Sequence, residues 1–262
     1  MPDGEPLLEL HGVSKRFGAV QALTDVDFEA HPGRVTALVG DNGAGKSTLI
    51  KTIAGINSMD SGEYRFDGKP VQVNSPQAAT ALGIATVYQD LALCDNLDVV
   101  ANLWLGREEL GGVRLLDETD MEQEASKVLK RLAVRIPSVR TQVASLSGGQ
   151  RQSVAIARSM LGEPRMVILD EPTAALGVAQ TAQVLELIRR LREQGLAVVV
   201  ISHNLADVFE VADTIVVLRL GRQIAVLDAK QTNSEEVVAA ITGLRASDEQ
   251  AADEQATEVS EQ

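Results

Sequence analysis

Eight consecutive residues near the start of the sequence have the pattern of a phosphate-binding loop. The run Gly-Asp-Asn-Gly-Ala-Gly-Lys-Ser at 40–47 fits the pattern G-x-x-x-x-G-K-[ST]. Its glycines allow a tight backbone turn that points successive N–H groups at one anion. Lys46 supplies a positive charge for the β- and γ-phosphates, and the Ser47 hydroxyl suits Mg²⁺. The loop therefore predicts binding of a nucleoside triphosphate. The residues assigned to the nucleotide on this basis are Gly40, Asn42, Gly43, Gly45, Lys46, Ser47 and Thr48.

Three later apolar runs end in polar side chains that suit phosphoryl transfer. The run 84–88 ends at Gln89, the run 166–169 at Asp170 and Glu171, and the run 196–201 at Ser202 and His203. Runs that are apolar on both faces and separated by helices predict a parallel sheet covered on both sides. Ligands of such sheets bind outside the carboxyl ends of the strands. We therefore expect these polar ends to converge on the phosphate loop.

Phosphoryl transfer to water needs charge neutralisation and a positioned nucleophile, which suggests a role for each of these side chains. Asp170 suits a carboxylate that holds Mg²⁺ through its water shell, and Glu171 suits a general base. His203 can orient the attacking water, and Gln89 can contact the metal and the water. Without a phosphate loop, two adjacent acids after a strand would indicate a helix cap or a solvated turn. The predicted metal ligands are Ser47, Gln89 and Asp170, and the predicted catalytic residues are Glu171, His203 and Gln89.

The apolar and turn residues indicate how the chain is organised around this site. The apolar residues of 35–39 predict the strand before the loop, and residues 48–54 predict a helix that stops at Gly55. Residues 7–39 and 60–90 contain further short strands and turns, whereas 91–163 is mostly helical and is expected to be an insertion. From 166 to 230 strands and helices alternate again. Ser234 is expected to cap a final short helix.

Composition and charge exclude several functional classes. The chain of 262 residues carries a net charge of −13, which does not suit gripping nucleic acid or anionic lipid unaided. The N-terminus lacks a secretory pattern, and no apolar run is long enough to span a bilayer. The one cysteine, Cys94, suits a reducing compartment and a packed side chain. Residues 246–262 contain acids and no base, and the tail 245–262 is predicted to be disordered.

The segment Leu-Ser-Gly-Gly-Gln at 146–150 makes the chain similar to the ATP-binding cassette (ABC) ATPases. The resemblance covers residues 7 to about 244, and the motifs occur in the family's order. It implies a P-loop NTPase core of the α/β class with a mostly parallel sheet, an N-terminal antiparallel β subdomain and a helical subdomain inserted at about 91–163. Residues 1–244 would form one nucleotide-binding domain. Phe17, otherwise expected to be core or turn packing, fits the aromatic residue that stacks on adenine.

The resemblance also implies a partner. The signature residues Ser147, Gly148, Gly149 and Gln150 would contact the γ-phosphate of ATP bound to a second cassette. Because this chain has one cassette, the simplest assembly is a homodimer that encloses two ATP molecules with Mg²⁺. The family commonly places an Asp that crosses this interface where the present chain has Gly177. Communication between the two sites is therefore expected to differ from the family pattern.

Several segments resemble cassettes of bacterial importers of ribose, xylose and fructose, namely 40–46, 88–93, 102–108 and 174–177. The resemblance implies an ATPase bound to the cytoplasmic face of the cell membrane by an integral permease. A periplasmic or extracellular sugar-binding protein would take part indirectly, and no nucleic acid is expected. Residues 91–106 would line the groove for the permease, and Trp104 either lies there or packs the helical block. The alternatives are a soluble ABC ATPase of cofactor or cluster assembly and an ABC protein of DNA repair or translation; the charge and the single compact cassette disfavour the latter.

Overall fold

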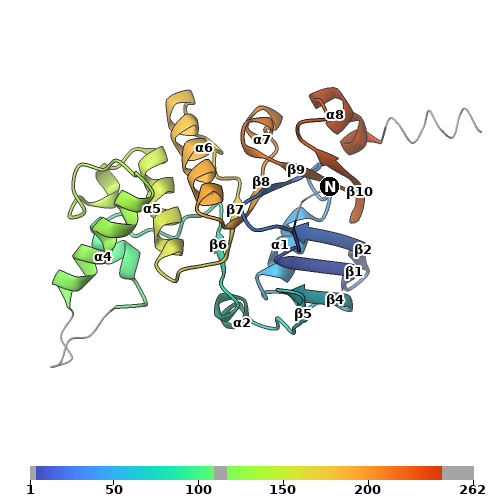
Figure 1. Cartoon of the computed structure of the whole chain (residues 1–262), viewed down its shortest axis with the longest axis horizontal. Coiled ribbons are helices and arrows are strands. Elements are labelled where there is room, and N and C mark those ends of the chain that lie inside the picture. Colours follow the sequence, from blue (N-terminus) through green and yellow to red (C-terminus); the bar gives the residue numbers. More distant parts are fainter. Residues whose placement is uncertain (1–3, 109–116, 244–262) are drawn as a thin grey trace, which may run out of the picture.

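The computed structural model describes residues 4–108 and 117–243, which fold around two sheets (Figure 1). The predicted tail lies outside these residues. The larger sheet has the strand order β10-β9-β3-β8-β7-β6, and its strands are parallel except for the antiparallel pair β9–β10. Its strands are β3 (Val35–Val39), β6 (Ile84–Val87), β7 (Met166–Asp170), β8 (Ala197–Ile201), β9 (Thr214–Arg219) and β10 (Arg222–Asp228). Every residue of β3 and β8 is buried, as expected for a sheet covered on both faces.

The smaller sheet is antiparallel and comes from the N-terminal part of the chain. Its strands β1 (Leu8–Phe17), β2 (Val20–Ala30), β4 (Ser61–Phe66) and β5 (Lys69–Pro70) lie in the order β2-β1-β4-β5. Helix α1 (Lys46–Ile53) lies between the two sheets in Figure 1. Leu49 and Ile53 of this helix share one buried cluster with Phe28 and Leu8 of the small sheet and Met166 of the large one. This packing fixes the helix that follows the phosphate loop.

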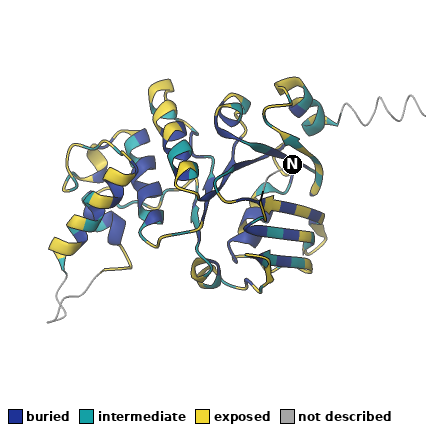
Figure 2. Cartoon of the chain, in the orientation of Figure 1, coloured by how far each residue is buried: buried dark blue, intermediate teal, exposed yellow. Residues whose placement is uncertain are grey.

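The opposite face of the large sheet is covered by α6 (Val178–Glu193), α7 (Leu205–Val211) and α8 (Ser234–Thr242) (Figure 1). A mostly helical lobe contains α3 (Val99–Trp104), α4 (Glu118–Arg131), the 3₁₀ turn η1 (Val143–Ser145) and α5 (Gly148–Met160), and α5 packs against β6 and α6 of the core, while α2 (Pro76–Ala81) lies beside β6. The mostly helical insertion is thus observed. Figure 2 shows that α4 buries one side and exposes the other. In the part of the chain that is described, no helix has the length and apolar character needed to cross a bilayer.

Short polar side chains define where the helices begin. Asp98 caps α3 by accepting the N–H of Ala101, and Asn204 caps α7 by accepting the N–H of Ala206. The expectation that Ser234 caps the last helix is wrong, because the Asn233 side chain accepts the Glu236 N–H and Ser234 is the first helical residue. Both residues are good N-caps, so sequence alone does not separate neighbouring candidates.

The helical lobe is tied to the strand end that carries Gln89. The side chain of Asn102 is fully buried; its oxygen accepts the Cys94 N–H at 2.7 Å, and its amide donates to the carbonyls of Cys94, Leu97 and Asp98. Trp104 donates from its indole to the carbonyl of Met121 in α4 at 3.0 Å and is buried. Trp104 therefore packs the helical block, which decides between the two places expected for it.

Candidate functional site

The phosphate loop leaves the end of β3 under tight steric constraint. Gly40 has a φ of 148°, and a Cβ there would lie 2.2 Å from the carbonyl oxygen of Leu218. Gly45 has a φ of 105° and immediately precedes Lys46, the first residue of α1. The Lys46 ammonium donates to the carbonyls of Gly40 at 2.6 Å and Asp41 at 3.0 Å. The loop thus has the strand–turn–helix geometry that its sequence predicts.

A cavity of about 560 Å³ opens at this edge of the sheet and brings most of the predicted site residues together. Asp170 is the last residue of β7, Glu171 follows it, and Gln89 lies just beyond β6. The predicted residues that line the cavity are Asn42, Gly43, Gly45, Lys46, Ser47, Thr48, Gln89, Asp170 and Glu171. The expected convergence is therefore observed for the polar residues after β6 and β7, whereas Gly40, Ser202 and His203 do not line this cavity.

Burial and mutual charge set the electrostatics of this cavity. Desolvation lowers the pKa of Lys46, against the opposing effect of Glu171, Asp41 and Asp170. Desolvation also raises the pKa of Asp170, and the neighbouring Glu171 raises it further, while Lys46 opposes both effects. Two carboxylates and one ammonium thus share a partly dehydrated space, where interactions between charges are stronger than in water.

Glu171 is held in an uncommon backbone conformation beside His203. Its φ of 50° lies in the left-handed region, and its N–H donates to the carbonyl of Ile201 at the end of β8 at 2.9 Å. Its carboxylate oxygen Oε2 lies 2.8 Å from Nδ1 of His203. The Glu171 side chain is mostly buried, whereas that of His203 is 73% exposed. His203 therefore reaches the cavity through Glu171.

A buried hydrogen bond that the sequence did not indicate supports this arrangement. The Thr173 hydroxyl donates to a carboxylate oxygen of Asp207 in the first turn of α7 at 2.6 Å, and both residues are buried. Thr173 follows Glu171 by two residues, and α7 begins just after His203. The bond thus joins the two loops that carry the Glu171–His203 pair.

Phe17 and the signature residues lie outside the residues that line this cavity. Phe17 is 47% exposed, and the Lys15 ammonium lies 5.4 Å from its ring centroid. It pairs across β1 and β2 with Val20, which does line the cavity. Stacking of Phe17 on a base therefore remains a prediction.

The signature segment begins α5 in the helical lobe. The Ser147 hydroxyl accepts the N–H of Gln150, and the Gln150 side-chain oxygen accepts the N–H of Ser147, which forms a capping box. A Cβ at Gly148 would lie 2.9 Å from a methyl group of Leu176, so the side-chain-free backbone lets these segments approach closely. Gly177 itself has open space around it and caps α6 without a side-chain bond.

Five cavity residues come from segments that the sequence did not assign to the site. They are Val20, Gln21 and Ala22 of β2 and Leu220 and Gly221 of the turn between β9 and β10. Gly221 donates its N–H to the carbonyl of Ala44 in the phosphate loop, and its carbonyl accepts the N–H of Thr24. The only sequence signal for this part of the cavity wall is the glycine of the turn. A turn glycine does not indicate which distant loop the turn will contact.

A family model described as ABC transporter matches residues 23–174. The chain is 47% identical to the fructose import ATP-binding protein FrcA of Rhizobium meliloti over 92% of this chain and 95% of that one. It is 48% identical to the xylose/arabinose import ATP-binding protein XylG of Sulfolobus acidocaldarius over 90% of this chain and 94% of that one.

Two solved structures show the same fold. One is a nucleotide-free ATP-binding cassette of an ABC transporter, with a TM-score of 0.79 and 27% identity over 91% of this chain and 96% of that chain. Another is a dimeric cassette in a post-hydrolysis state with ADP and Pi, with a TM-score of 0.70 and 25% identity over 86% of this chain and all of that chain.

The raised pKa of Asp170 predicts that replacing its carboxyl group stabilises the metal-free protein. The folded state binds a proton more tightly than the unfolded state, so ionisation of Asp170 lowers the free energy of unfolding as the pH rises above about 3.8. Asp170→Asn should therefore melt at a higher temperature than the wild type at pH 7. The difference should shrink as the pH falls toward 4, as followed by thermal unfolding in EDTA. An Asn variant that is less stable at pH 7 would contradict this account of the site.

Proposed function

Since the chain belongs to the ABC transporter family, we propose that it is the ATP-hydrolysing subunit of an importer for a simple sugar. The observation that supports this most strongly is the cavity where the phosphate loop meets Gln89, Asp170 and Glu171. The similarity to named sugar import ATP-binding proteins over almost the whole chain supports the transport role.

In this proposal ATP binds with its phosphates in the loop at 40–47. The backbone N–H groups of the loop and the N-terminal end of α1 favour negative charge, and Lys46 adds its ammonium. Phosphate oxygens would replace the carbonyls of Gly40 and Asp41 as the acceptors of this ammonium. Binding a polyanion would also raise the lowered pKa of Lys46 back toward its ordinary value, because a nearby negative charge favours the ammonium form.

The oxygen donors of the cavity fit Mg²⁺. Ser47, Gln89 and Asp170 provide a hydroxyl, an amide carbonyl and a carboxylate, all of which are hard oxygen ligands. In the described ranges no group of three or more His, Cys, Asp and Glu residues is arranged to hold a metal by itself. That matches a site where water and nucleotide phosphates complete the coordination. When bound, the ion neutralises charge on the β- and γ-phosphates.

Hydrolysis is assigned to Glu171 with the help of two neighbours. Glu171 accepts a proton from the attacking water as general base, and its left-handed backbone directs the carboxylate into the cavity. His203, 2.8 Å from that carboxylate, orients the base and the water. Gln89 reaches the same cavity from the strand end that leads to the helical lobe, so it links nucleotide binding to that lobe.

A second copy of the chain would complete the site. The segment Ser147–Gln150 does not line the cavity of its own chain, although it presents N–H groups of Gly148 and Gly149 at the start of a long helix. Two cassettes placed head to tail would bring each signature segment to the ATP of the other. A homodimer with two equivalent ATP sites follows, and a cassette with a similar fold has been solved as a dimer with ADP and Pi.

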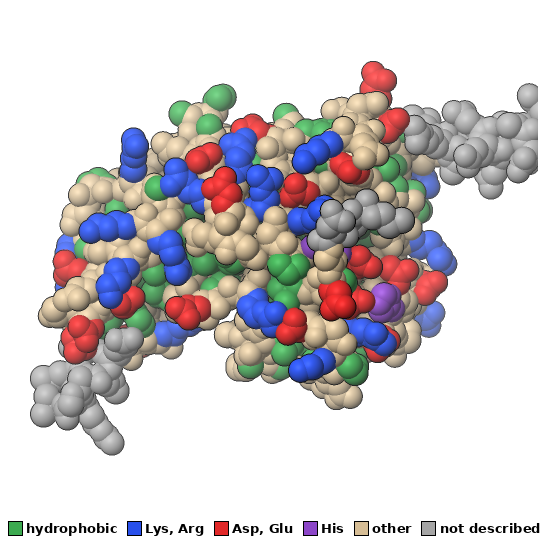
Figure 3. All heavy atoms as spheres, viewed as in Figure 1, with side chains coloured by type: hydrophobic (Ala, Val, Ile, Leu, Met, Phe, Trp, Pro, Cys, Tyr) green, Lys and Arg blue, Asp and Glu red, His purple; other side chains and the backbone are tan. Residues whose placement is uncertain are grey.

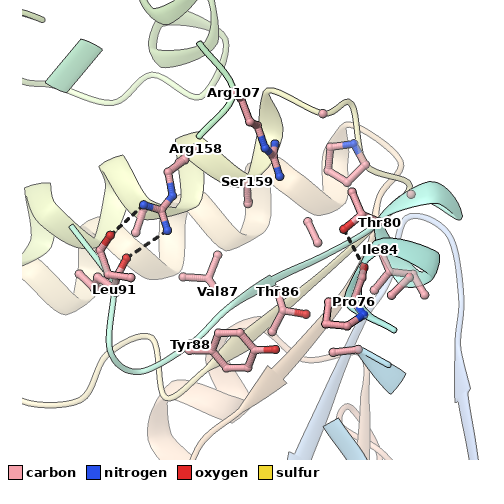
Figure 4. Close-up of a pocket in the computed structure, with 18 of the residues that line it drawn as sticks. Pro76, Thr80, Ile84, Thr86, Val87, Tyr88, Leu91, Arg107, Arg158 and Ser159 are labelled. Atoms are coloured by element: carbon pink, nitrogen blue, oxygen red, sulfur yellow. Dashed lines mark hydrogen bonds between the residues drawn. The ribbon is translucent and has the colours of Figure 1, made fainter. Parts of the chain in front are cut away.

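The permease is proposed to bind in a groove between the sheet and the helical lobe. Figure 4 shows this cavity of about 450 Å³, whose lining includes Leu91, Leu105, Arg107 and Arg158. Arg158 of α5 donates to the carbonyls of Ala92 and Leu91, which follow Gln89 by a few residues. A helix seated here would therefore contact both the segment after Gln89 and the helix that begins with the signature.

The alternative, a soluble ABC ATPase of cofactor or cluster assembly, shares the nucleotide chemistry. The similarity to import proteins and the groove beside the segment 91–106 favour transport. On the face shown in Figure 3, basic and acidic side chains of the described residues are interspersed, without the broad basic region typical of nucleic-acid binding. The protein would act at the cytoplasmic face of the membrane, with a sugar-binding protein on the other side as an indirect partner.

Removing the Thr173 hydroxyl should slow ATP hydrolysis without weakening ATP binding. Thr173→Val keeps the side-chain shape but leaves the Asp207 carboxylate without its buried donor, so the Glu171 and His203 loops lose a connection. We expect kcat to fall roughly 10-fold while the Kd for ATP stays within about two-fold. Thr173→Ser should restore most of the rate. Equal loss of kcat in the Val and Ser variants would show that the hydroxyl does not position these loops.

The transport role is tested by recovering partners of the tagged chain from gently solubilised membranes, with identification by mass spectrometry. A multi-spanning permease should be recovered with the wild type and lost with Leu105→Glu, which places a charge in the groove. Ile56→Glu is the matched control, because Ile56 is similarly exposed, 47% against 44%, and lies outside the groove lining. Recovery of soluble assembly proteins alone would instead support the alternative. If a permease is recovered, adding candidate sugars and their binding protein to the complex and measuring which sugar stimulates ATP turnover would identify the substrate.

A further inference from the structure

The turn between β9 and β10 contains an apolar residue where folding does not favour one. Leu220 and Gly221 join the strands in a two-residue hairpin, and both have positive φ, 49° and 74°. Such turns favour Asn, Asp or Gly at the first position, because a branched side chain is strained there. Leu220 is also 77% exposed, so its side chain gains little from burial. Neither local conformation nor core packing accounts for a leucine at this position.

The location of this residue suggests what it contacts. Leu220 lines the cavity of the phosphate loop, as does Val20, which is 65% exposed. The turn is fixed in place because Gly221 bonds to Ala44 of the loop and to Thr24 of β2. A Cβ at Gly221 would lie 2.7 Å from the carbonyl oxygen of Ala22, so this close approach of the turn to β2 requires glycine. The strained leucine is thus held beside the phosphate loop by the two backbone hydrogen bonds of Gly221.

The sheet order divides this cavity into an apolar side and a charged side. Strand β3, which carries the loop, lies between β9 on one side and β8, β7 and β6 on the other. Gln89, Asp170 and Glu171 follow strands on the second side, so the reacting γ-phosphate belongs there. The apolar side chains of Leu220, Val20 and Ala22 belong to the β9 and β2 side, where Gln21 is the one polar side chain among the described lining residues. A triphosphate that runs from the loop toward Glu171 therefore leaves its ribose and base on the apolar side.

We propose that Leu220 is a nucleoside-binding residue that packs against the ribose and base of ATP. This inference rests on the proposed ATP-binding function and adds a contact that is separate from the stacking expected of Phe17. The strain of the left-handed leucine is then explained by binding, since strained residues occur where a ligand contact requires them. Because the contact is apolar, it should contribute to affinity for the nucleoside part and not for the phosphates.

The test compares Leu220→Asn with the wild-type full-length chain in calorimetric titrations of ATP and of inorganic tripolyphosphate with Mg²⁺. Asn suits the first position of this turn, so the variant should melt at the wild-type temperature or above it. We expect its Kd for ATP to rise about five-fold, the effect of losing a modest apolar contact, with the affinity for tripolyphosphate unchanged. Val226→Thr is the control, because Val226 is exposed on the same hairpin but does not line this cavity.

Three outcomes would overturn the inference, and each differs from failure of the proposed function. Unchanged ATP affinity in Leu220→Asn would exclude a nucleoside contact. Equal weakening of ATP and tripolyphosphate would show that the turn acts on the loop itself. Unchanged affinity with weaker ATP-driven dimerisation, followed by light scattering, would assign Leu220 to the contact between cassettes. By contrast, a wild-type chain that does not bind ATP would refute the proposed function.

Discussion

The parallel pairing of β3 with β8, and of β8 with β7, is the constraint on which the site depends. These strands are almost entirely buried, so their polar ends can lie only where the strands stop. Parallel direction makes them stop at the same edge. The phosphate loop, Asp170 and Ile201 therefore meet at one cavity, although they are distant in sequence. Packing of α1 between the two sheets then holds the helix that begins at Lys46.

The polar groups at this edge destabilise the free protein, and binding a charged ligand accounts for why they are kept there. Desolvation opposes the charges on both Lys46 and Asp170, and Glu171 adopts a left-handed backbone conformation. The hydrogen bonds from Glu171 to Ile201 and from Thr173 to Asp207 maintain this geometry. A triphosphate would supply negative charge beside Lys46, and a divalent cation would supply positive charge beside Asp170. The cavity is thus organised for a charged ligand, whereas a purely structural turn would keep its acids in solvent.

Much of the fold and of the site could be predicted from the sequence, because the decisive signals are local. The loop at 40–47 specifies its own turn and helix, and the polar residues after each apolar run indicate the edge where they gather. The wall formed by Leu220, Gly221 and β2 was not predicted, since it depends on long-range contact between a hairpin turn and Ala44. The Thr173–Asp207 bond was missed for the same reason. The cap at Asn233 was misplaced by one residue because its neighbour Ser234 is equally suitable.

The most direct test of this account is ATP binding and steady-state turnover measured on the Glu171→Gln variant. Gln preserves the shape of the side chain but cannot accept the proton from the attacking water. The account predicts ATP affinity close to that of the wild type, turnover reduced by about 100-fold or more, and accumulation of an ATP-bound dimer. Turnover near the wild-type rate would contradict the assignment of Glu171 as the base and, with it, the mechanism proposed for this edge of the sheet.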